Sequence, residues 1–425
     1  MLDIQFIRDQ SESVKEACRN KQLSDKVVNE LLSTDSKRRE LIVRVEEIRQ
    51  EINANANKIK AQVGKGNKPE QELIQHGKDL KEQLKEVEPN LKELESKFNK
   101  LILQIPNVPA DGVPVGVDEG GNQVVRKAGE LPKFDFEPRT HDDLLESLNL
   151  LDTKRGVKIA GFRGYFLKND GLLLEQALLQ YAQDLLRADG FDIMSVPNLV
   201  NEEMMVGTGY FPWGSEDHYQ TQDGQVLAGT AEVALTAYHA KETLAEKDLP
   251  IKMAGISTCY RREVGAHGQD TKGIIRVHQF NKVEQVIYTI ADEKETISWH
   301  ETLLGNAENL LQSLKLPYQV LLMCTGDMGA GQRKKYDVET WFPSQNKYRE
   351  THSCSYFNDF QARRLSIKYQ AKDGNVKHVY TMNNTMAASP RLLAAIIENY
   401  QQPDGSIKVP EVLKKYVGKS LIEYL

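Results

Sequence analysis

Polar side chains within apolar, strand-like segments are the residues of this sequence best suited to chemistry. In the segment GTAEVAL, Thr230 and Glu232 stand two positions apart. Residues two apart on a strand face the same side, so this hydroxyl and this carboxylate together could bind an ammonium group. A surface strand is the alternative, and it is favoured if this segment is considered alone.

A second segment, residues 259–286, reads CYRREVGAHGQDTKGIIRVHQFNKVEQV. We expect a strand with Arg261 and Glu263 on one face, then a loop over residues 265–273 that is rich in glycine and charge. An antiparallel return strand would carry Arg276, Phe280 and Glu284. Such a pair of strands could clamp a nucleotide, because arginine neutralises phosphate, a carboxylate accepts from an adenine amino group, and phenylalanine stacks on the base.

Two further segments carry candidates for binding anions and cations. The segment YRETHSCS contains Glu350 and Ser353, and oxygen ligands of this kind suit Mg²⁺ together with phosphate oxygens. The segment MNNTMAASPRLLAAIIENY predicts a strand that runs into a helix, with Arg391 at the helix start. A helix N-terminus favours anionic groups, although an isolated arginine there is more often a surface residue.

The elements that must position these residues follow residue 131, where helix-like and strand-like runs alternate. The predicted strands are 226–227, 274–277, 282–290 and 376–382, and the predicted helices are 172–188 and 391–400. Before them, residues 106–131 are rich in proline, glycine and valine, which predicts an extended linker and a domain boundary.

The N-terminal part has a different pattern. Residues 27–63 and 73–105 repeat aliphatic side chains at alternating steps of four and three, a period typical of coiled-coil helices. The turn-forming sequence GKGNKP at 64–69 predicts an antiparallel hairpin of two helices, each roughly 50 Å long. The pattern is interrupted at Asp35, Arg38, Arg49 and Gly77. Pro89 lies inside the second helix, where we expect a kink or an unwound turn.

The tip of this hairpin is basic. No acidic residue lies between Ile52 and Pro69, whereas four lysines do: Lys58, Lys60, Lys65 and Lys68. A bare heptad pattern favours a dimerisation coiled coil, but a basic tip on a rigid rod suits a phosphate backbone. A solvated loop stays open as an alternative for the four lysines.

Composition limits the class of protein. The 425 residues, 40% hydrophobic and 27% charged, are typical of a globular chain of two or three domains. The net charge of −6 neither predicts nor excludes nucleic-acid binding, since a local basic patch can act within an acidic chain. No apolar run approaches the roughly 18 residues of a membrane span, and residues 1–21 lack a signal-peptide core.

Four scattered cysteines (Cys18, Cys259, Cys324 and Cys354) without a CxxC pair favour a reduced, cytosolic protein and argue against a thiolate zinc site. Walker A, GxGxxG and GxSxG motifs are absent from the sequence. The chemistry therefore rests on the four polar segments above.

Together and in this order, these segments resemble a class II aminoacyl-tRNA synthetase. RRE at 261–263 resembles the second signature motif of that class, and MNNTMAASPR at 382–391 resembles the third. A helix ending near Gly190, followed by FDIMSVPNLV, resembles the first motif, which in this class belongs to the dimer interface. Within the class, the segments TAE, KVEQV, RETHSCS and ENYQQPDGSIKVPEVLKKY and the N-terminal hairpin are similar to seryl-tRNA synthetases.

The resemblance implies an α+β fold. An antiparallel-sheet class II catalytic domain would cover residues 132–425, and an antiparallel coiled-coil arm would lie within a tRNA-binding domain over residues 1–105. The implied reaction activates L-serine with ATP and then transfers it to the 3′ end of tRNA(Ser), with tRNA(Sec) as a further candidate. A cytoplasmic homodimer that uses Mg²⁺ with ATP, and has no membrane partner, is also implied.

The resemblance also implies site residues. Those for serine are Thr230, Glu232, Arg261, Glu284 and Thr385. Those for ATP are Arg261, Arg262, Glu263, Val277, Phe280, Glu350, Thr351, His352, Ser353 and Arg391, with Glu350 and Ser353 also holding Mg²⁺. Those for tRNA are Lys58, Lys60, Lys65 and Lys68.

The chain departs from the common family pattern in its third motif. Asn384, Met386 and Pro390 stand where many members carry glycines, and Arg262 replaces a common serine. Two rival functions stay open: a paralogue that loads a carrier protein, and an inactive paralogue that binds RNA. The heptads and sparse cysteines argue against the first, and the retained arginines and glutamates argue against the second.

Overall fold

The computed structural model describes residues 1–264, 270 and 272–424, which form two compact units. One unit comprises residues 2–19 and 23–106. The other comprises residues 107–425 with residues 1 and 20–22. None of the helices in the described part of the chain combines the length and the hydropathy needed to cross a membrane.

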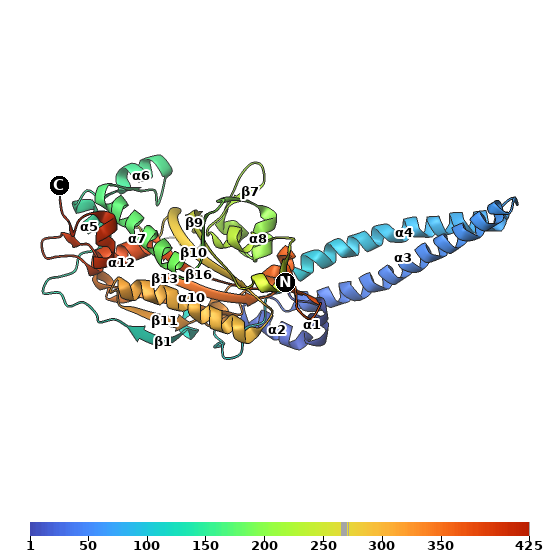
Figure 1. Ribbon diagram of the computed structural model, residues 1–425, viewed down its shortest axis with the longest axis horizontal. Coiled ribbons are helices and arrows are strands. Elements are labelled where there is room, and N and C mark those ends of the chain that lie inside the picture. The colour runs from blue at the N-terminus through green and yellow to red at the C-terminus, as the bar shows by residue number, and fades with distance from the viewer. Residues whose placement is uncertain (265–269, 271, 425) are drawn as a thin grey trace. The chain divides into compact units, whose positions relative to one another are not determined.

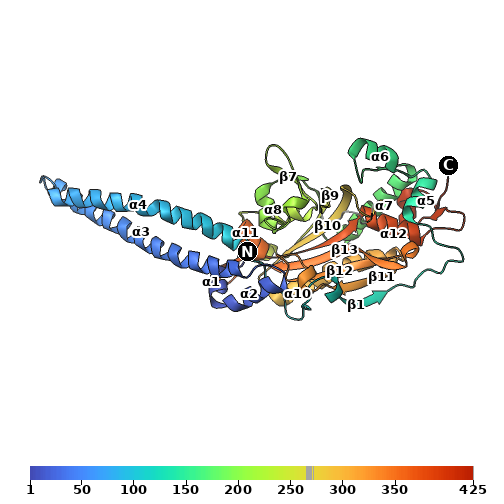
Figure 2. The same cartoon turned by 180° about the vertical axis from the view of Figure 1, so that it is seen from behind.

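The first unit is helical. It contains α1 (Ile4–Asp9), α2 (Ser11–Asn20), α3 (Lys26–Gly64) and α4 (Gln71–Ile102). The helices α3 and α4 lie side by side over their length, and the chain reverses between them (Figures 1 and 2). The predicted antiparallel hairpin is therefore confirmed, with both helices close to the limits of the 3.5-residue pattern.

Two of the charged residues that interrupt the first heptad pattern, Asp35 and Arg38, anchor the base of the hairpin. Asp35 is buried, and its carboxylate accepts hydrogen bonds of 2.8 Å from both Arg8 of α1 and Arg38. The Arg38 guanidinium lies 3.9 Å from the centroid of the Phe98 ring on α4. A buried carboxylate is stable only when it is paired, so these two arginines fix α1 and α4 against α3.

Gly77, the lapse in the second pattern, marks a close approach of the two helices. Asn55 of α3 is buried there, and its Nδ2 donates to the Leu73 carbonyl at 2.8 Å. A Cβ atom on Gly77 would lie 2.8 Å from the same Nδ2. A larger residue at position 77 would therefore have to displace the Asn55 side chain from the space between the two helices. Helix α4 continues through Pro89, so the expected unwound turn does not occur. Proline has no N–H to donate to the carbonyl of Lys85, four residues earlier. Both residues are exposed, so water can take the place of that donor.

The second unit is built on an eight-stranded sheet among the described residues. In spatial order its strands are β1 (Gln123–Ala128), β11 (Tyr318–Leu322), β12 (Lys334–Phe342), β13 (Lys347–Asn358), β16 (Tyr380–Ala388), β10 (Gln279–Thr289), β9 (Ile251–Tyr260) and β4 (Asp192–Ser195). All neighbours pair antiparallel except β4 and β9, which are parallel. The predicted α+β class with an antiparallel sheet is confirmed.

Three helices cover one face of this sheet: α7 (Asn169–Ala188), α10 (Glu293–Ser313) and α12 (Ser389–Asn399) (Figures 1 and 2). The helices predicted at 172–188 and 391–400 correspond to α7 and α12. Val283 and Ile287 of β10 lie with Leu303 and Leu310 of α10 in a core without exposed area. Because strand residues alternate, the neighbours of Val283 and Ile287 are directed to the opposite face.

Smaller elements complete the unit. The helices are α5 (His141–Ser147), α6 (Thr153–Ala160), α8 (Glu202–Thr208), α9 (Glu232–Thr236), α11 (Phe360–Leu365) and α13 (Lys414–Val417). The strands are β2 (Leu151–Asp152), β3 (Phe166–Leu167), β5 (Leu199–Asn201), β6 (Tyr219–Gln220), β7 (Gln225–Leu227), β8 (Thr243–Ala245), β14 (Lys368–Gln370), β15 (Val376–His378), β17 (Ile407–Lys408) and β18 (Leu421–Ile422).

Several local elements of this unit differ from those predicted. Residues 274–277 form a turn and a bend and precede β10, which begins only at Gln279. The strand expected at 376–382 divides into β15 and β16. The stretch 106–131, expected to be a linker throughout, contains β1, which pairs with β11 at the sheet edge. That pairing joins segments almost two hundred residues apart, so the local sequence pattern does not predict it.

We predict that Gly77→Leu loosens the arm, although leucine would complete the heptad pattern. The added side chain would overlap Asn55 and break its bond to Leu73, at a cost of roughly 1–3 kcal/mol. Hydrogen exchange of the full chain should show faster exchange over residues 50–80 and unchanged exchange in α7. The pair Asn55→Ala with Gly77→Leu should regain protection, and greater protection in the single variant would contradict this account.

Candidate active site

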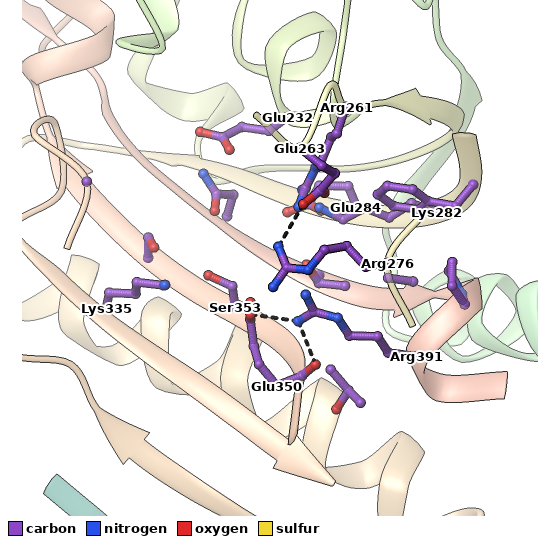
Figure 3. Close-up of a pocket in the computed structure, with 18 of the residues that line it drawn as sticks. Glu232, Arg261, Glu263, Arg276, Lys282, Glu284, Lys335, Glu350, Ser353 and Arg391 are labelled. Atoms are coloured by element: carbon purple, nitrogen blue, oxygen red, sulfur yellow. Dashed lines mark hydrogen bonds and ion pairs between the residues drawn. The ribbon is translucent and has the colours of Figure 1, made fainter. Parts of the chain in front are cut away.

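A cavity of about 270 Å³ opens on the sheet face opposite α10. It brings together most of the residues expected from the sequence, which are Glu232, Arg261, Glu263, Val277, Phe280, Glu284, Glu350, Thr351, Ser353, Thr385 and Arg391 (Figure 3). The strands β10, β13 and β16, the helices α9 and α12, and the segments after β9 and before β10 contribute them. Segments up to about 160 residues apart in the sequence, from Glu232 to Arg391, therefore meet at one site.

A β-bulge explains how Glu350 and Ser353 share this cavity. Three positions apart on a regular strand, they would point to opposite faces. The register between β12 and β13 shifts, however: Val338 faces His352, and the next residue, Glu339, faces Glu350. The extra residue, Thr351, reverses the alternation, so both oxygen ligands line the cavity.

His352 lies on the other side of this strand. It is almost fully buried, and its Nδ1 lies 2.9 Å from the Thr351 hydroxyl. Burial lowers the pKa of His352 to about 4, so the ring is neutral. Its side chain does not line the cavity, and neither does that of Arg262, which donates to the Glu216 carbonyl at 2.9 Å.

Arg261 and Glu263 do not share a strand face as expected, because β9 ends at Tyr260. Glu263 instead has a left-handed backbone with φ of 55°, and its carboxylate accepts from Arg276 at 2.7 Å (Figure 3). The Arg261 guanidinium lies 5.3 Å from the centroid of the Phe280 ring. The loop expected at 265–273 lies largely outside the described residues. Arg261 and Glu263 therefore both reach the cavity because of the backbone path after β9, and not because of strand alternation.

Thr230 and Glu232 are likewise not on a strand. Glu232 opens the short helix α9, and its backbone N–H donates to the Thr230 hydroxyl at 3.2 Å. This bond from the backbone two residues later to the threonine hydroxyl forms an ST-turn that leads into the helix. The Glu232 carboxylate accepts from Tyr210 at 2.7 Å and from Gln361 at 3.0 Å. Burial, and after it the nearby Glu284 carboxylate, raises the pKa of Glu232 to about 7.

Glu284 is buried on β10 and forms an ion pair with Lys282, two residues earlier on the same strand. Lys282 also donates to the Thr230 hydroxyl at 3.0 Å. Burial raises the pKa of Glu284, and Lys282 opposes that rise. Lys282 was not among the residues expected from the sequence. Because residues two positions apart on a strand lie on the same face, its place two residues before Glu284 would have identified it.

The other side of the cavity is rich in cations. Arg391 donates to Glu350 at 2.8 Å (Figure 3). Lys335 pairs with Asp337 at 3.0 Å. Burial alone would raise the pKa of Glu350, but Arg391 and Lys335 outweigh it and lower the pKa to about 2. An ionised carboxylate beside the Ser353 hydroxyl is a donor set that fits Mg²⁺. Lys335 and Arg276 also line the cavity, although the sequence analysis did not include them among the residues that bind serine or ATP.

A buried network supports the entry to β10. Glu398 of α12 accepts from the His141 backbone at 3.1 Å and lies 2.9 Å from His141 Nδ1. His141 Nε2 lies 3.4 Å from the Ile274 nitrogen, which donates to it. The Ile275 carbonyl in turn accepts from Arg391 at 3.3 Å. Since Nε2 accepts, the His141 proton is on Nδ1 and points to Glu398, which fixes the backbone of residues 274–277 beside the cavity.

Comparison with known proteins agrees with this geometry. Residues 1–109 match the seryl-tRNA synthetase N-terminal domain, and residues 217–400 match the tRNA synthetase class II core domain (G, H, P, S and T). The chain is 46% identical to the serine–tRNA ligase of Deinococcus radiodurans over 98% of both chains. It belongs to the seryl-tRNA synthetase family.

Two further relatives extend this result. The serine–tRNA ligase of Nitrosopumilus maritimus is 39% identical over 98% of this chain and 99% of its own. The crystal structure of seryl-tRNA synthetase from Pyrococcus horikoshii, complexed with ATP, superposes with a TM-score of 0.93 at 37% identity, covering 100% of both chains. The family resemblance therefore spans the arm and the sheet unit alike.

We predict that Glu398→Gln weakens ATP binding by roughly 1–3 kcal/mol, because an amide can no longer hold His141 and Ser344 together with all four hydrogen bonds. Titration with ATP would measure the loss. Ser344→Ala is the matched control, since Ser344 contacts the same carboxylate but not the 274–277 backbone. A lower melting temperature with unchanged ATP affinity would show that Glu398 supports only the fold.

Proposed function

We infer that this protein is a serine–tRNA ligase, which activates L-serine with ATP and transfers it to the 3′ end of tRNA(Ser). The observation that carries this is the distribution of charge in one cavity. Buried carboxylates, Glu232 and Glu284, form one part, whereas Arg276, Arg391 and Lys335 supply cations in another. Such a site suits an amino acid at one end and a triphosphate at the other.

At the amino-acid end, Glu232 accepts hydrogen bonds from the serine ammonium, with Thr230 beside it. Glu284 and Thr385 receive the serine hydroxyl. Arg261 binds the serine carboxylate and the α-phosphate. Its charge acts to lower the pKa of Glu284 at the amino-acid end and of Glu350 at the nucleotide end, so it lies within range of both ends of the cavity. The carboxylate is thereby placed next to the phosphorus that it attacks.

At the nucleotide end, Phe280 stacks on adenine and Glu263 accepts from its amino group. The Val277 backbone seats the nucleotide, and Arg391 holds the γ-phosphate. Glu350 and Ser353 would hold Mg²⁺, which neutralises phosphate charge when it is bound. Arg262, Thr351 and His352 complete the proposed set through their backbone positions, since the side chains of Arg262 and His352 are turned away from the cavity.

The reaction requires positioning more than proton transfer. A serine carboxylate oxygen forms a bond to the α-phosphorus, the bond from that phosphorus to the bridging oxygen breaks, and pyrophosphate leaves. A carboxylate is already a nucleophile at neutral pH, so no general base is needed. Arginines that are preorganised around the phosphates stabilise the charge that develops. In the second step, a terminal hydroxyl of tRNA attacks the seryl carbonyl carbon and AMP leaves.

The arm is the proposed tRNA-binding element. Lys58, Lys60, Lys65 and Lys68 are exposed around the turn between α3 and α4. Lysines position a nucleic acid through its phosphates without reading sequence. We propose a tRNA-binding domain over residues 1–105, a connection over 106–131 that includes β1, and a catalytic domain over 132–425. A homodimer, a cytoplasmic location and the use of tRNA(Sec) stay predictions from the family resemblance.

We predict that ATP–pyrophosphate exchange, measured with each of the twenty amino acids and without tRNA, is supported by serine alone. Glu284→Ala should abolish it, because the serine hydroxyl loses its acceptor and Lys282 is left buried without a counter-ion. Lys334→Met, on β12 and outside the cavity lining, is a matched control and should retain exchange. No exchange with any amino acid would instead indicate an inactive paralogue, and near-normal exchange by Glu284→Ala would refute the site.

We predict that shortening the arm separates the two steps. A variant in which residues 46–82 are replaced by the native turn sequence GKGN should keep serine-dependent exchange and lose tRNA charging by about tenfold or more. Changing the four tip lysines to serine should weaken charging less. The difference from the wild type should shrink at higher salt, because salt screens the phosphate contacts that the variant lacks. Equal loss of exchange and charging would contradict separate roles for the two units.

A further inference from the structure

Lys282 is the charged residue at the amino-acid end for which the proposed function above has no task. It is 6% exposed and lies on β10, two residues before Glu284. Its ammonium forms an ion pair with Glu284 and donates to the Thr230 hydroxyl at 3.0 Å. Figure 3 shows it on the same strand as Glu284, at the cavity wall. It therefore touches two residues proposed to bind serine.

The charges around this point balance. Glu232 and Glu284 are the two carboxylates. The charge of Lys282 acts on both of them, and that of Arg261 acts on Glu284. Tyr210 and Gln361 donate to Glu232, while Asn383 and Thr385 contribute neutral groups to the lining. Once Glu232 is ionised, the site offers carboxylates to an ammonium group and a guanidinium to a carboxylate, which makes it complementary to a zwitterion.

We propose that Lys282 is a positioning residue for amino-acid specificity: its ammonium keeps the Glu284 carboxylate a pure hydrogen-bond acceptor, so that the site selects a side chain that donates. This proposal rests on the proposed serine site. Lys282 acts through Glu284 and does not itself need to contact the substrate.

The physical reason is the chemistry of a buried carboxyl group. Two carboxylates close together in an apolar wall do not both stay ionised without a compensating cation. Without Lys282, Glu284 would take up a proton and become a donor as well as an acceptor. When an amino acid whose side chain has no hydrogen-bond donor is bound, the buried Glu284 carboxylate is left without a partner, which costs free energy and disfavours binding. A neutral carboxylic acid costs far less free energy to bury without a partner, so it would disfavour such an amino acid less. Discrimination between serine and alanine therefore depends on the charge of Glu284.

The test compares Lys282→Met, Lys282→Arg and the control Lys334→Met, with serine- and alanine-dependent exchange measured from about pH 6.5 to 9 at saturating ATP. Wild-type KM for serine should fall as pH rises through about 7, where Glu232 ionises. Lys282→Met should raise this KM by roughly 10- to 100-fold at neutral pH. Because the Glu284 pKa rises without the lysine, KM should recover only at higher pH. The preference for serine over alanine should fall, and Lys282→Arg should restore most of it.

A double-mutant cycle separates this role from a merely structural one. If Lys282 acts through Glu284, Lys282→Met should change serine KM and the serine preference much less in a Glu284→Gln background than in the wild type. The double variant also lacks an unpaired buried charge, so it can be measured if Lys282→Met alone does not fold. Equal effects in both backgrounds, or a wild-type pH profile in Lys282→Met, would overturn the proposal. Absence of serine exchange in the wild type would instead overturn the proposed function.

Discussion

Opposite charges buried on one face of an antiparallel sheet are the constraint on which the rest of the catalytic unit depends. Strand alternation sends the neighbours of each polar residue to the other face, where they must form an apolar core. On β10, Lys282 and Glu284 face the cavity while Val283 and Ile287 pack beneath α10. The helices α7, α10 and α12 are thus required on one face because the other is reserved for charge.

Removing charges from water is costly, and the pairs in this wall recover only part of that cost. Lys282 with Glu284, Lys335 with Asp337 and Arg391 with Glu350 each place a cation against a carboxylate. Their value for function lies in preorganisation. Dipoles and charges that are already oriented do not need to reorganise when the α-phosphate develops charge during attack. The surrounding core holds them in place, because Lys282, Glu284, Lys335, Asp337 and Glu350 all lie on strands of the central sheet.

Local departures from regular helix and strand geometry position side chains as much as the regular sheet does. The bulge at Thr351 brings Glu350 and Ser353 to one side, and the left-handed backbone at Glu263 directs its carboxylate to Arg276. In the arm, Asn55 and Gly77 replace an apolar layer with a polar close contact. Each exception is stabilised by partners distant in sequence, so each is a property of the folded unit.

The sequence by itself determined the elements whose signal is local. The 3.5-residue period placed α3 and α4, because a helix repeats its contacts within a few residues, and the helices α7 and α12 and the body of β10 followed from composition. The family motifs identified the residues that gather in the cavity. Only the tertiary structure decided which charges pair, that Glu232 opens a helix, that β1 joins the sheet and that His352 faces the core. These depend on strand register and on contacts between distant segments, where a shift of one residue reverses every side chain.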